Sequence, residues 1–172
     1  MKEVGRFLIV VTSVAWAGFP VLTKGVTSES AKAFFEISIH VTSKGDELFN
    51  NWDRPTGKPF SVQSIKVVRR GQFLSAVVLF KGCKPDVSGN CNALVDIIAY
   101  DPRGRVYGEM RGVELWQQKP APRAGYTQLS RSYMGLIIEP NDPPGTYRIT
   151  AVARDLNGKS EAKSELRFEV NK

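Results

Sequence analysis

The sequence predicts an all-β protein, an antiparallel β-sandwich of about eight or nine strands. Short apolar segments with a period of two recur along the chain, turn residues separate them at short intervals, and helical periodicity is almost absent. The chain has 172 residues, of which 42% are hydrophobic and 10% aromatic. This is the length of one domain, with enough apolar side chains to build a core.

The first residues indicate export. Residues 1–17 combine a basic start, an apolar stretch too short to span a bilayer and an A-x-A cleavage site. We expect a signal peptide cleaved after Ala17, so that the mature protein is periplasmic or secreted and has no transmembrane segment. An uncleaved membrane anchor is the alternative. Residues 18–33 have no clear period and predict a flexible leader, which leaves 34–172 as a single domain.

The predicted domain begins with an additional strand and loop over 34–63. Apolar and polar residues alternate over 35–42, and His40 falls on the polar side. Residues 45–52 then suggest a single helical turn that ends with Trp52. This segment precedes the part of the chain that predicts the sandwich itself.

The middle of the chain predicts the core strands. Residues 73–81 are apolar on both parities, which is typical of a central strand covered on both faces. Residues 93–100 alternate, with Val95, Ile97 and Ala99 on the expected inner face. The other expected strands cover 64–70, 105–110, 112–116, 133–138, 145–154 and 166–170, and the longest irregular stretch between them is Gln117–Gln128.

The two cysteines agree with export. Cys83 and Cys91 bracket a segment made of turn residues, which predicts a disulfide closing a short loop. Such a bridge contributes about 2.5 kcal/mol in the chain-entropy account. Zinc is the competing interpretation, but it needs about four ligands and His40 is the single other soft ligand. We expect no metal and no cofactor.

The best-organised stretch covers residues 142–152. Asp142, Gly145 and Tyr147 stand at the spacing D-x-x-G-x-Y, and an alternating strand follows. This pattern resembles the tyrosine corner of immunoglobulin-like sandwiches, and the last two strands are similar to those of exported bacterial immunoglobulin-like and macroglobulin-like domains. The resemblance implies a buried Tyr147 whose hydroxyl bonds to backbone near Asp142. Ile149 stands where antibody domains have their second inter-sheet cysteine.

Charge patterning does not predict nucleic-acid binding. The chain has 24 basic and 17 acidic residues, a net charge of +7, without a long basic run. If the strands that carry them are neighbours, several arginines would form a cationic patch that attracts anionic envelope polymers or lipid headgroups. These are Arg69, Arg70, Arg103, Arg105 and Arg111. The alternative is a solvated face.

No recognisable catalytic signature is present. His40 is the single histidine, and the sequence contains no G-x-S-x-G elbow, P-loop or G-x-G-x-x-G pattern. Asp96 is the acid most strongly expected inside a strand, where it would point outward from an exposed face. We therefore expect no enzyme, and a hydrolase ranks third among the possible functions.

Binding through loops fits the sequence better, because sandwiches expose loops at both ends. Aromatic and basic residues lie in or beside irregular segments, and this composition is typical of interface hot spots. They are Trp52, Trp116, Lys119, Arg123 and Tyr126. We hypothesise that Gln117–Gln128 forms one wall of a recognition surface; alternatively, the tryptophans close the ends of the core.

The sequence thus predicts a non-enzymatic binding or accessory module that recognises a protein or an envelope polymer. A structural interaction subunit of an envelope assembly, joined through the edge of a sheet, is the alternative.

Overall fold

The computed structural model describes residues 35–52 and 62–171. They belong to one compact unit, Lys32–Lys172. The expected signal peptide, 1–17, and leader, 18–33, lie outside the described residues, and cleavage after Ala17 stays a prediction. In the part of the chain that is described, no helix is long and apolar enough to cross a membrane.

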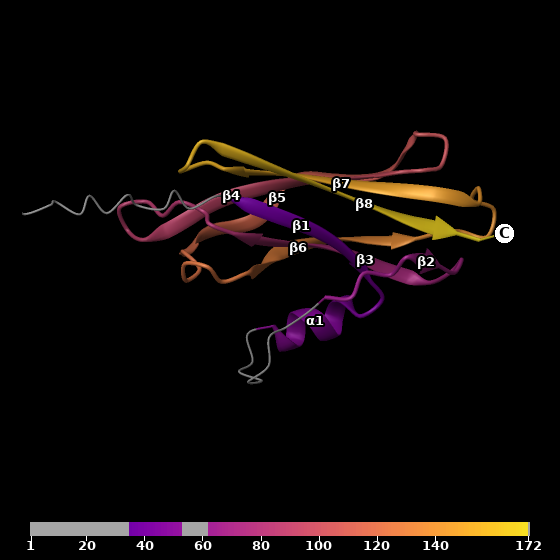
Figure 1. Cartoon of the computed structure of the whole chain (residues 1–172), viewed down its shortest axis with the longest axis horizontal. Coiled ribbons are helices and arrows are strands. Elements are labelled where there is room, and N and C mark those ends of the chain that lie inside the picture. The colour runs from indigo at the N-terminus through magenta and orange to yellow at the C-terminus, as the bar shows by residue number, and fades with distance from the viewer. Residues whose placement is uncertain (1–34, 53–61, 172) are drawn as a thin grey trace, which may run out of the picture. The chain divides into compact units, whose positions relative to one another are not determined.

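The described domain consists of eight strands and one short helix (Figure 1). In chain order they are β1 (Glu36–Thr42), α1 (Gly45–Asn51), β2 (Val67–Val68), β3 (Phe73–Lys81), β4 (Asn90–Tyr100), β5 (Val106–Pro120), β6 (Gln128–Ile137), β7 (Gly145–Asp155) and β8 (Ser160–Val170). The strands form two sheets, with the orders β1-β3-β6 and β2-β8-β7-β4-β5. Their pairings are antiparallel apart from the short parallel β2–β8 pair. The predicted antiparallel β-sandwich is confirmed.

The strand order is that of an immunoglobulin-like sandwich. The neighbours β8, β7, β4 and β5 correspond to the G, F, C and C′ strands, and β1, β3 and β6 correspond to A, B and E. This topology places the β3–β4, β5–β6 and β7–β8 connections at one end of the sandwich (Figure 1, left).

Two neighbouring strands, β4 and β7, supply the centre of the core. Buried residues alternate with partly exposed ones along both, because successive side chains of a strand point to opposite faces. The predicted inner faces are therefore confirmed. Their buried residues are Val95, Ile97 and Ala99 in β4 and Tyr147, Ile149, Ala151 and Ala153 in β7.

A tyrosine corner leads into β7. Tyr147 is 1% exposed, and its hydroxyl donates to the backbone carbonyl of Pro143 at 3.1 Å. The ring stacks against Phe168 with 5.5 Å between the centroids. Gly145 has a φ of 127°, and a Cβ there would lie 3.1 Å from Pro102 Cβ, so the corner requires glycine. At this close approach, the tyrosine corner packs the β6–β7 connection against the turn that follows β4.

The central strand β3 is buried over seven consecutive residues, as its apolar character on both parities predicts. One face lies in the core, and α1 covers the other (Figure 1). Leu48 of α1 packs there with Val77 of β3 and Leu129 of β6. The helix begins close to the sheet, since a Cβ on Gly45 would lie 2.2 Å from Ser75 Oγ.

The predicted strand over 64–70 is wrong in length. Only Val67–Val68 pair with a sheet, and they run parallel to the end of β8. Just before them, the backbone N–H of Ile65 donates to the Val41 carbonyl of β1 at 2.8 Å. The segment crosses from one sheet to the other, so it cannot continue as a strand of either.

The two strands predicted over 105–110 and 112–116 are the single strand β5. Gly112 has a φ of 59°, and the register against β4 shifts around it, which marks a β-bulge. The predicted irregular stretch Gln117–Gln128 is consequently wrong at its start. Only residues 121–127 connect β5 to β6 without strand structure.

Candidate binding site at the loop end

Three connections meet at one end of the sandwich: residues 82–89, 121–127 and 156–159. We call them together the loop end. In immunoglobulin-like sandwiches, loops at one end of a rigid scaffold are placed to recognise partners.

The first loop is closed by the predicted disulfide. Cys83 and Cys91 are joined with an S–S distance of 2.04 Å, and both pack against the main core. Inside the loop, one carboxylate oxygen of Asp86 accepts the backbone N–H groups of Ser88 at 2.8 Å and Asn90 at 3.0 Å. These bonds fix the backbone on both sides of the loop tip.

The β7–β8 turn is bonded to this loop. Asp155 is 2% exposed, and its Oδ2 accepts the backbone N–H of Lys84 at 2.8 Å. Asn157 Nδ2 donates to the carbonyls of Lys84 and Asn90 at 3.1 and 3.0 Å. A Cβ on Gly158 would lie 2.3 Å from Asp155 Oδ2, so this close approach requires glycine. The disulfide loop and the turn therefore form one bonded unit.

The third connection reaches the same unit. The backbone N–H of Ala121 donates to the Gly89 carbonyl at 3.0 Å. Beyond it, the Arg123 guanidinium lies 5.5 Å from the centroid of the Tyr126 ring, a cation–π contact on an exposed side chain. Two of the predicted binding residues, Arg123 and Tyr126, thus lie together at the loop end.

Trp116 and Lys119 support the loop end from behind. The Trp116 ring packs against the core, with its centroid 5.7 Å from that of Phe80, and its Nε1 donates to the Pro120 carbonyl at 3.0 Å. Lys119 forms an ion pair with Glu114. The hydrogen bond from Lys119 is the largest cause of the lowered pKa of Glu114. Trp116 therefore closes the core at this end. The positive charge of Lys119 is neutralised by Glu114.

The structure separates Trp52 from the other predicted binding residues. Trp52 follows α1 and packs on the outer cluster that contains Val77 and Leu79 of β3. Trp116 contacts Phe80, which points to the opposite face of the same strand. The proposal that Trp52 joins the Gln117–Gln128 wall is corrected, because β3 lies between them.

Four of the five predicted arginines lie at the opposite end, which we call the corner end because it contains the tyrosine corner, and two of the four are bonded within the fold. Arg70 donates to the backbone carbonyls of Asn171 at 2.8 Å and Asp142 at 3.1 Å. Arg105 forms an ion pair with Asp101 at 2.7 Å. Both guanidinium groups are thus used within the fold.

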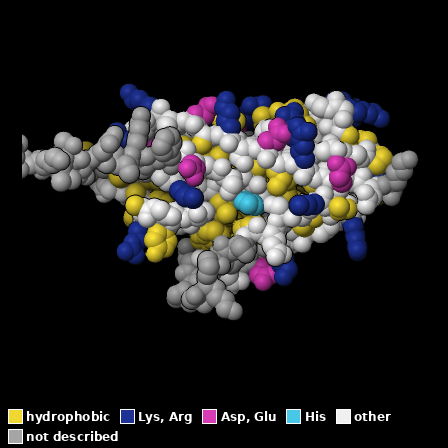
Figure 2. Space-filling view, in the orientation of Figure 1, with side chains coloured by type: hydrophobic (Ala, Val, Ile, Leu, Met, Phe, Trp, Pro, Cys, Tyr) yellow, Lys and Arg dark blue, Asp and Glu magenta, His cyan; other side chains and the backbone are white. Residues whose placement is uncertain are grey.

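The remaining arginines do not complete a single patch. Arg111 lies midway along β5 and pairs with Glu109 at 2.9 Å. Arg69 and Arg103 are exposed at the corner end. Lys and Arg side chains are spread over the visible face with acids among them (Figure 2). Arg111 therefore lies apart from the four arginines of the corner end, and both Arg111 and Arg105 are paired with acids.

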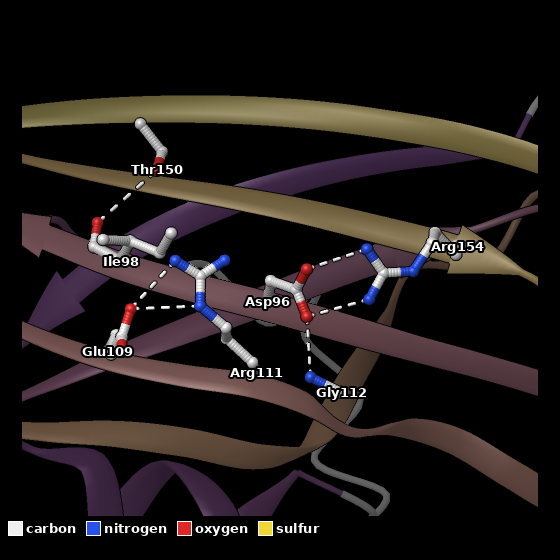
Figure 3. A network of polar contacts seen from close by, with 7 residues as sticks. All are labelled: Asp96, Ile98, Glu109, Arg111, Gly112, Thr150 and Arg154. Atoms are coloured by element: carbon white, nitrogen blue, oxygen red, sulfur yellow. Dashed lines mark hydrogen bonds and ion pairs between the residues drawn. The ribbon is translucent and has the colours of Figure 1, made fainter.

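A polar network crosses the outer face of the larger sheet (Figure 3). Asp96 of β4 accepts two bonds from Arg154 of β7, at 2.7 and 2.8 Å, and one from the Gly112 backbone N–H at 2.6 Å. The Arg154 hydrogen bond is the largest cause of the lowered pKa of Asp96. Arg111 and Glu109 lie beside it (Figure 3). The network ties the bulge of β5 to the centre of the sheet.

His40 lies on the outer side of β1, where the single cyan group reaches the surface in Figure 2. Its Nδ1 is 3.0 Å from Ser64 Oγ and its Nε2 is 3.0 Å from Ser38 Oγ. Burial lowers the pKa of the imidazole, so the ring is neutral at pH 7. Among the residues that the structure describes, no group of three or more His, Cys, Asp or Glu side chains could hold a metal ion.

The outward side chains of the loop end include several that the sequence did not single out. Val87, at the tip of the disulfide loop, has a relative exposure of 107%, and Leu156 in the turn has 44%. Lys84 and Lys159 are exposed beside them. An apolar residue inside a segment of turn residues was the available signal for Val87. Its place at the same end of the sandwich as Leu156 follows from the topology alone.

Comparisons with known proteins identify no family. No family profile and no curated protein sequence matches the chain. Among solved structures, the Pseudomonas fluorescens alkylpurine DNA glycosylase AlkC bound to DNA matches with a TM-score of 0.39 and 14% identity, over 83% of this chain and 32% of that chain. A family 123 glycoside hydrolase from Clostridium perfringens gives 0.38 and 7%, over 78% and 27%.

A third match is smaller than these enzymes. The CARDB domain of a Pyrococcus furiosus protein gives a TM-score of 0.34 and 14% identity, over 80% of this chain and 95% of that domain. The chain spans about a third or less of the first two proteins. At these TM-scores the matches carry no argument about function.

Proposed function

We propose that this chain is an exported, non-enzymatic binding or accessory module that recognises an envelope component or a protein partner through its loop end. The observation that carries the proposal is the contrast between how the loops are held and what they present. Their backbones are fixed by a disulfide and by bonds from Asp155, Asn157 and Ala121. Their exposed side chains include apolar and basic ones that are not used for those bonds.

The basic side chains of the loop end are exposed and have no acidic partner among the described residues. Lys84, Arg123 and Lys159 are exposed, and no ion pair involves them within the described residues. Several Arg and Lys side chains of the sheet faces are paired with acids, whereas Arg69 and Arg103 at the corner end are, in the part of the chain that is described, as exposed and unpaired as those of the loop end. A charge that is left unpaired on a rigid loop remains available to a ligand, without a pair that must first be broken.

The alternative function, a structural subunit joined by strand addition, is less favoured at β5, which is one of the edge strands of the two sheets. Its register against β4 shifts at several points, and Gly112 and Gln118 have φ values of 59° and 48°. Bulges twist an edge and interrupt the row of backbone groups that a partner strand needs. Recognition by loops does not require a regular strand edge, and the backbones of these loops are fixed by the bonds described above.

The proposal is tested with the exported, oxidised protein as bait for its native envelope. In the test variant, Lys84, Arg123 and Lys159 are each changed to Gln, and in a matched control Arg69 and Arg103 are changed to Gln. We expect the test variant to retain its stability, since all these side chains are exposed, and to lose the component captured by the parent. Capture by the test variant at the parental level would overturn the proposal.

A further inference from the structure

Apolar side chains of the loop end are exposed to solvent. Val87 is fully exposed, although the loop that carries it is fixed by Asp86 and by the disulfide. A branched apolar side chain held in water gains free energy when another surface removes it from water. Because the loop is rigid, little conformational entropy is lost on that contact.

A second apolar side chain is presented in the same way by the neighbouring turn. Leu156 is 44% exposed, and its backbone N–H donates to the Asn92 carbonyl at 2.8 Å. The turn is bonded to the disulfide loop through Asn157. The third connection contributes Tyr126, which is 59% exposed. Three exposed side chains with apolar surface are thus carried by three loops whose backbones are bonded to one another.

Basic side chains accompany each of these apolar ones. Lys84 lies three positions before Val87, Lys159 three positions after Leu156, and Arg123 contacts Tyr126. The loops contain one acid, Asp86, whose carboxylate is occupied by backbone N–H groups. The loop end is therefore complementary to an anionic surface that has an apolar layer close beneath its charges.

A bilayer with anionic lipids has this layered arrangement. Its phosphate groups lie at the surface, and its acyl chains begin a few ångströms below them. Lysine side chains can remain at the phosphates while shorter apolar side chains enter the acyl boundary. A folded protein partner would need three separate pockets at fixed spacing, whereas lipids rearrange around each side chain. The chemistry of the loop end favours lipid.

We propose that the loop end docks on an anionic lipid bilayer, with Val87 and Leu156 in the boundary between headgroups and acyl chains and with Lys84, Lys159 and Arg123 on lipid phosphates. This inference rests on the proposed function and names the envelope component. Tyr126 lies at the level of the headgroups, where aromatic rings with a polar end are favoured.

Vesicle co-sedimentation tests the docking. The oxidised, exported protein is mixed with vesicles of phosphatidylcholine alone and of phosphatidylcholine with phosphatidylglycerol. We expect partitioning onto the anionic vesicles that falls as salt is added, because counterions screen the lysines. Changing Lys84 and Lys159 to Gln should lower the partition coefficient about fivefold for each charge. Changing Arg69 and Arg103 to Gln at the corner end should leave it unchanged.

The apolar contribution needs its own matched pair of variants. Val87→Ser with Leu156→Ser should lower partitioning by about fivefold or more. Val67→Ser with Val106→Ser should not, although these valines are also exposed, at 54% and 55%. If the variant with Val87→Ser and Leu156→Ser binds the vesicles as well as the parent does, only electrostatic attraction to the surface remains, and the proposed insertion of these side chains is wrong.

The two proposals can fail separately. If the protein does not partition onto anionic vesicles, but the variant with Lys84, Arg123 and Lys159 changed to Gln loses a captured protein, the lipid inference is wrong and the binding function stands. If neither vesicle binding nor capture depends on these residues, both proposals are wrong. Unfolding midpoints equal to that of the parent establish that each variant is folded.

Discussion

Tyr147 illustrates how single side chains fix the connections of this sandwich. It lies at the start of β7, contacts Phe168 of β8 and Tyr107 of β5, and is bonded to the connection that precedes it. The Tyr107 hydroxyl lies 2.6 Å from the Ile137 carbonyl and also contacts Asp142. Burial and the hydrogen bond with Asp142 raise the pKa of Tyr107 well above its ordinary value. Tyr147 and Tyr107 therefore both bond to the β6–β7 connection, one from β7 and the other from β5.

Tyr147→Phe should lower the free energy of unfolding by about 1 kcal/mol, because the partly buried Pro143 carbonyl loses its donor. Urea unfolding at neutral pH measures the change. Val67→Ser, at an exposed position of the same end, serves as the control that should have little effect. A loss below about 0.3 kcal/mol for Tyr147→Phe would show that the hydroxyl does not hold the corner.

At the residue scale, the sequence predicted local patterns better than distant neighbours. The spacing of Asp142, Gly145 and Tyr147 encodes a corner that closes within a few residues. The side on which Trp52 lies depends on how α1 packs against β3, which no local spacing records. Val87 and Leu156 come from loops that are far apart in the sequence, and only the strand order places these loops at the same end of the sandwich.

Among the elements, β5 is the one whose extent the sequence concealed. Its alternation breaks at Gly112, where the bulge shifts the register against β4. In sequence, a break of this kind is indistinguishable from the end of a strand. The structure shows why the strand continues: Asp96 accepts the Gly112 N–H while it is held by Arg154. The strand therefore continues beyond the bulge because of a cross-strand contact, which no local sequence pattern records.

Asp96→Asn should lower stability at pH 7 by about 1 kcal/mol, because a charged acceptor of three hydrogen bonds becomes neutral. The folded-state pKa of Asp96 is lowered. The stabilisation is therefore present above the unfolded pKa, near 3.9, and is lost as pH falls through the lower folded value. The difference between variant and parent should shrink in this acid range.

Urea unfolding of both proteins at pH 7 and at about pH 3 measures this dependence. Glu165→Gln is the control, since Glu165 also accepts bonds from two arginines, Arg148 and Arg167, but lies more exposed on the same face. Its effect should be smaller. An Asp96→Asn deficit that persists unchanged into acid would contradict the role given to the carboxylate.

At the scale of the whole molecule, the fold class followed from the sequence because alternation and turn residues agree along most of the chain. The sheet order did not, because it depends on pairings between distant segments such as β1 with β3. The disulfide could be predicted because its loop is short. Its further role, as the base to which the β7–β8 turn is bonded, required the positions of Asp155 and Asn157.

Replacing Cys83 and Cys91 with Ala should lower the free energy of unfolding by about 2.5 kcal/mol and leave the sandwich folded. The sheets do not depend on the bridge, because their core is built by β3, β4, β7 and β8. Urea unfolding gives the stability, and near-ultraviolet circular dichroism reports the packing of Tyr147 and Trp116. Loss of the aromatic signal under native conditions would contradict the prediction.

The two ends of the described chain lie at opposite ends of the domain. β1 begins at Glu36, opposite Lys81 and beside the loop end, whereas β8 ends at Val170, opposite Gly145 at the corner end. β8, which runs from the loop end to the corner end, has eleven residues and is roughly 35 Å long. A support joined on the N-terminal side would therefore be attached beside the loop end. A support joined after Asn171 would be attached at the opposite end and would leave the loops free.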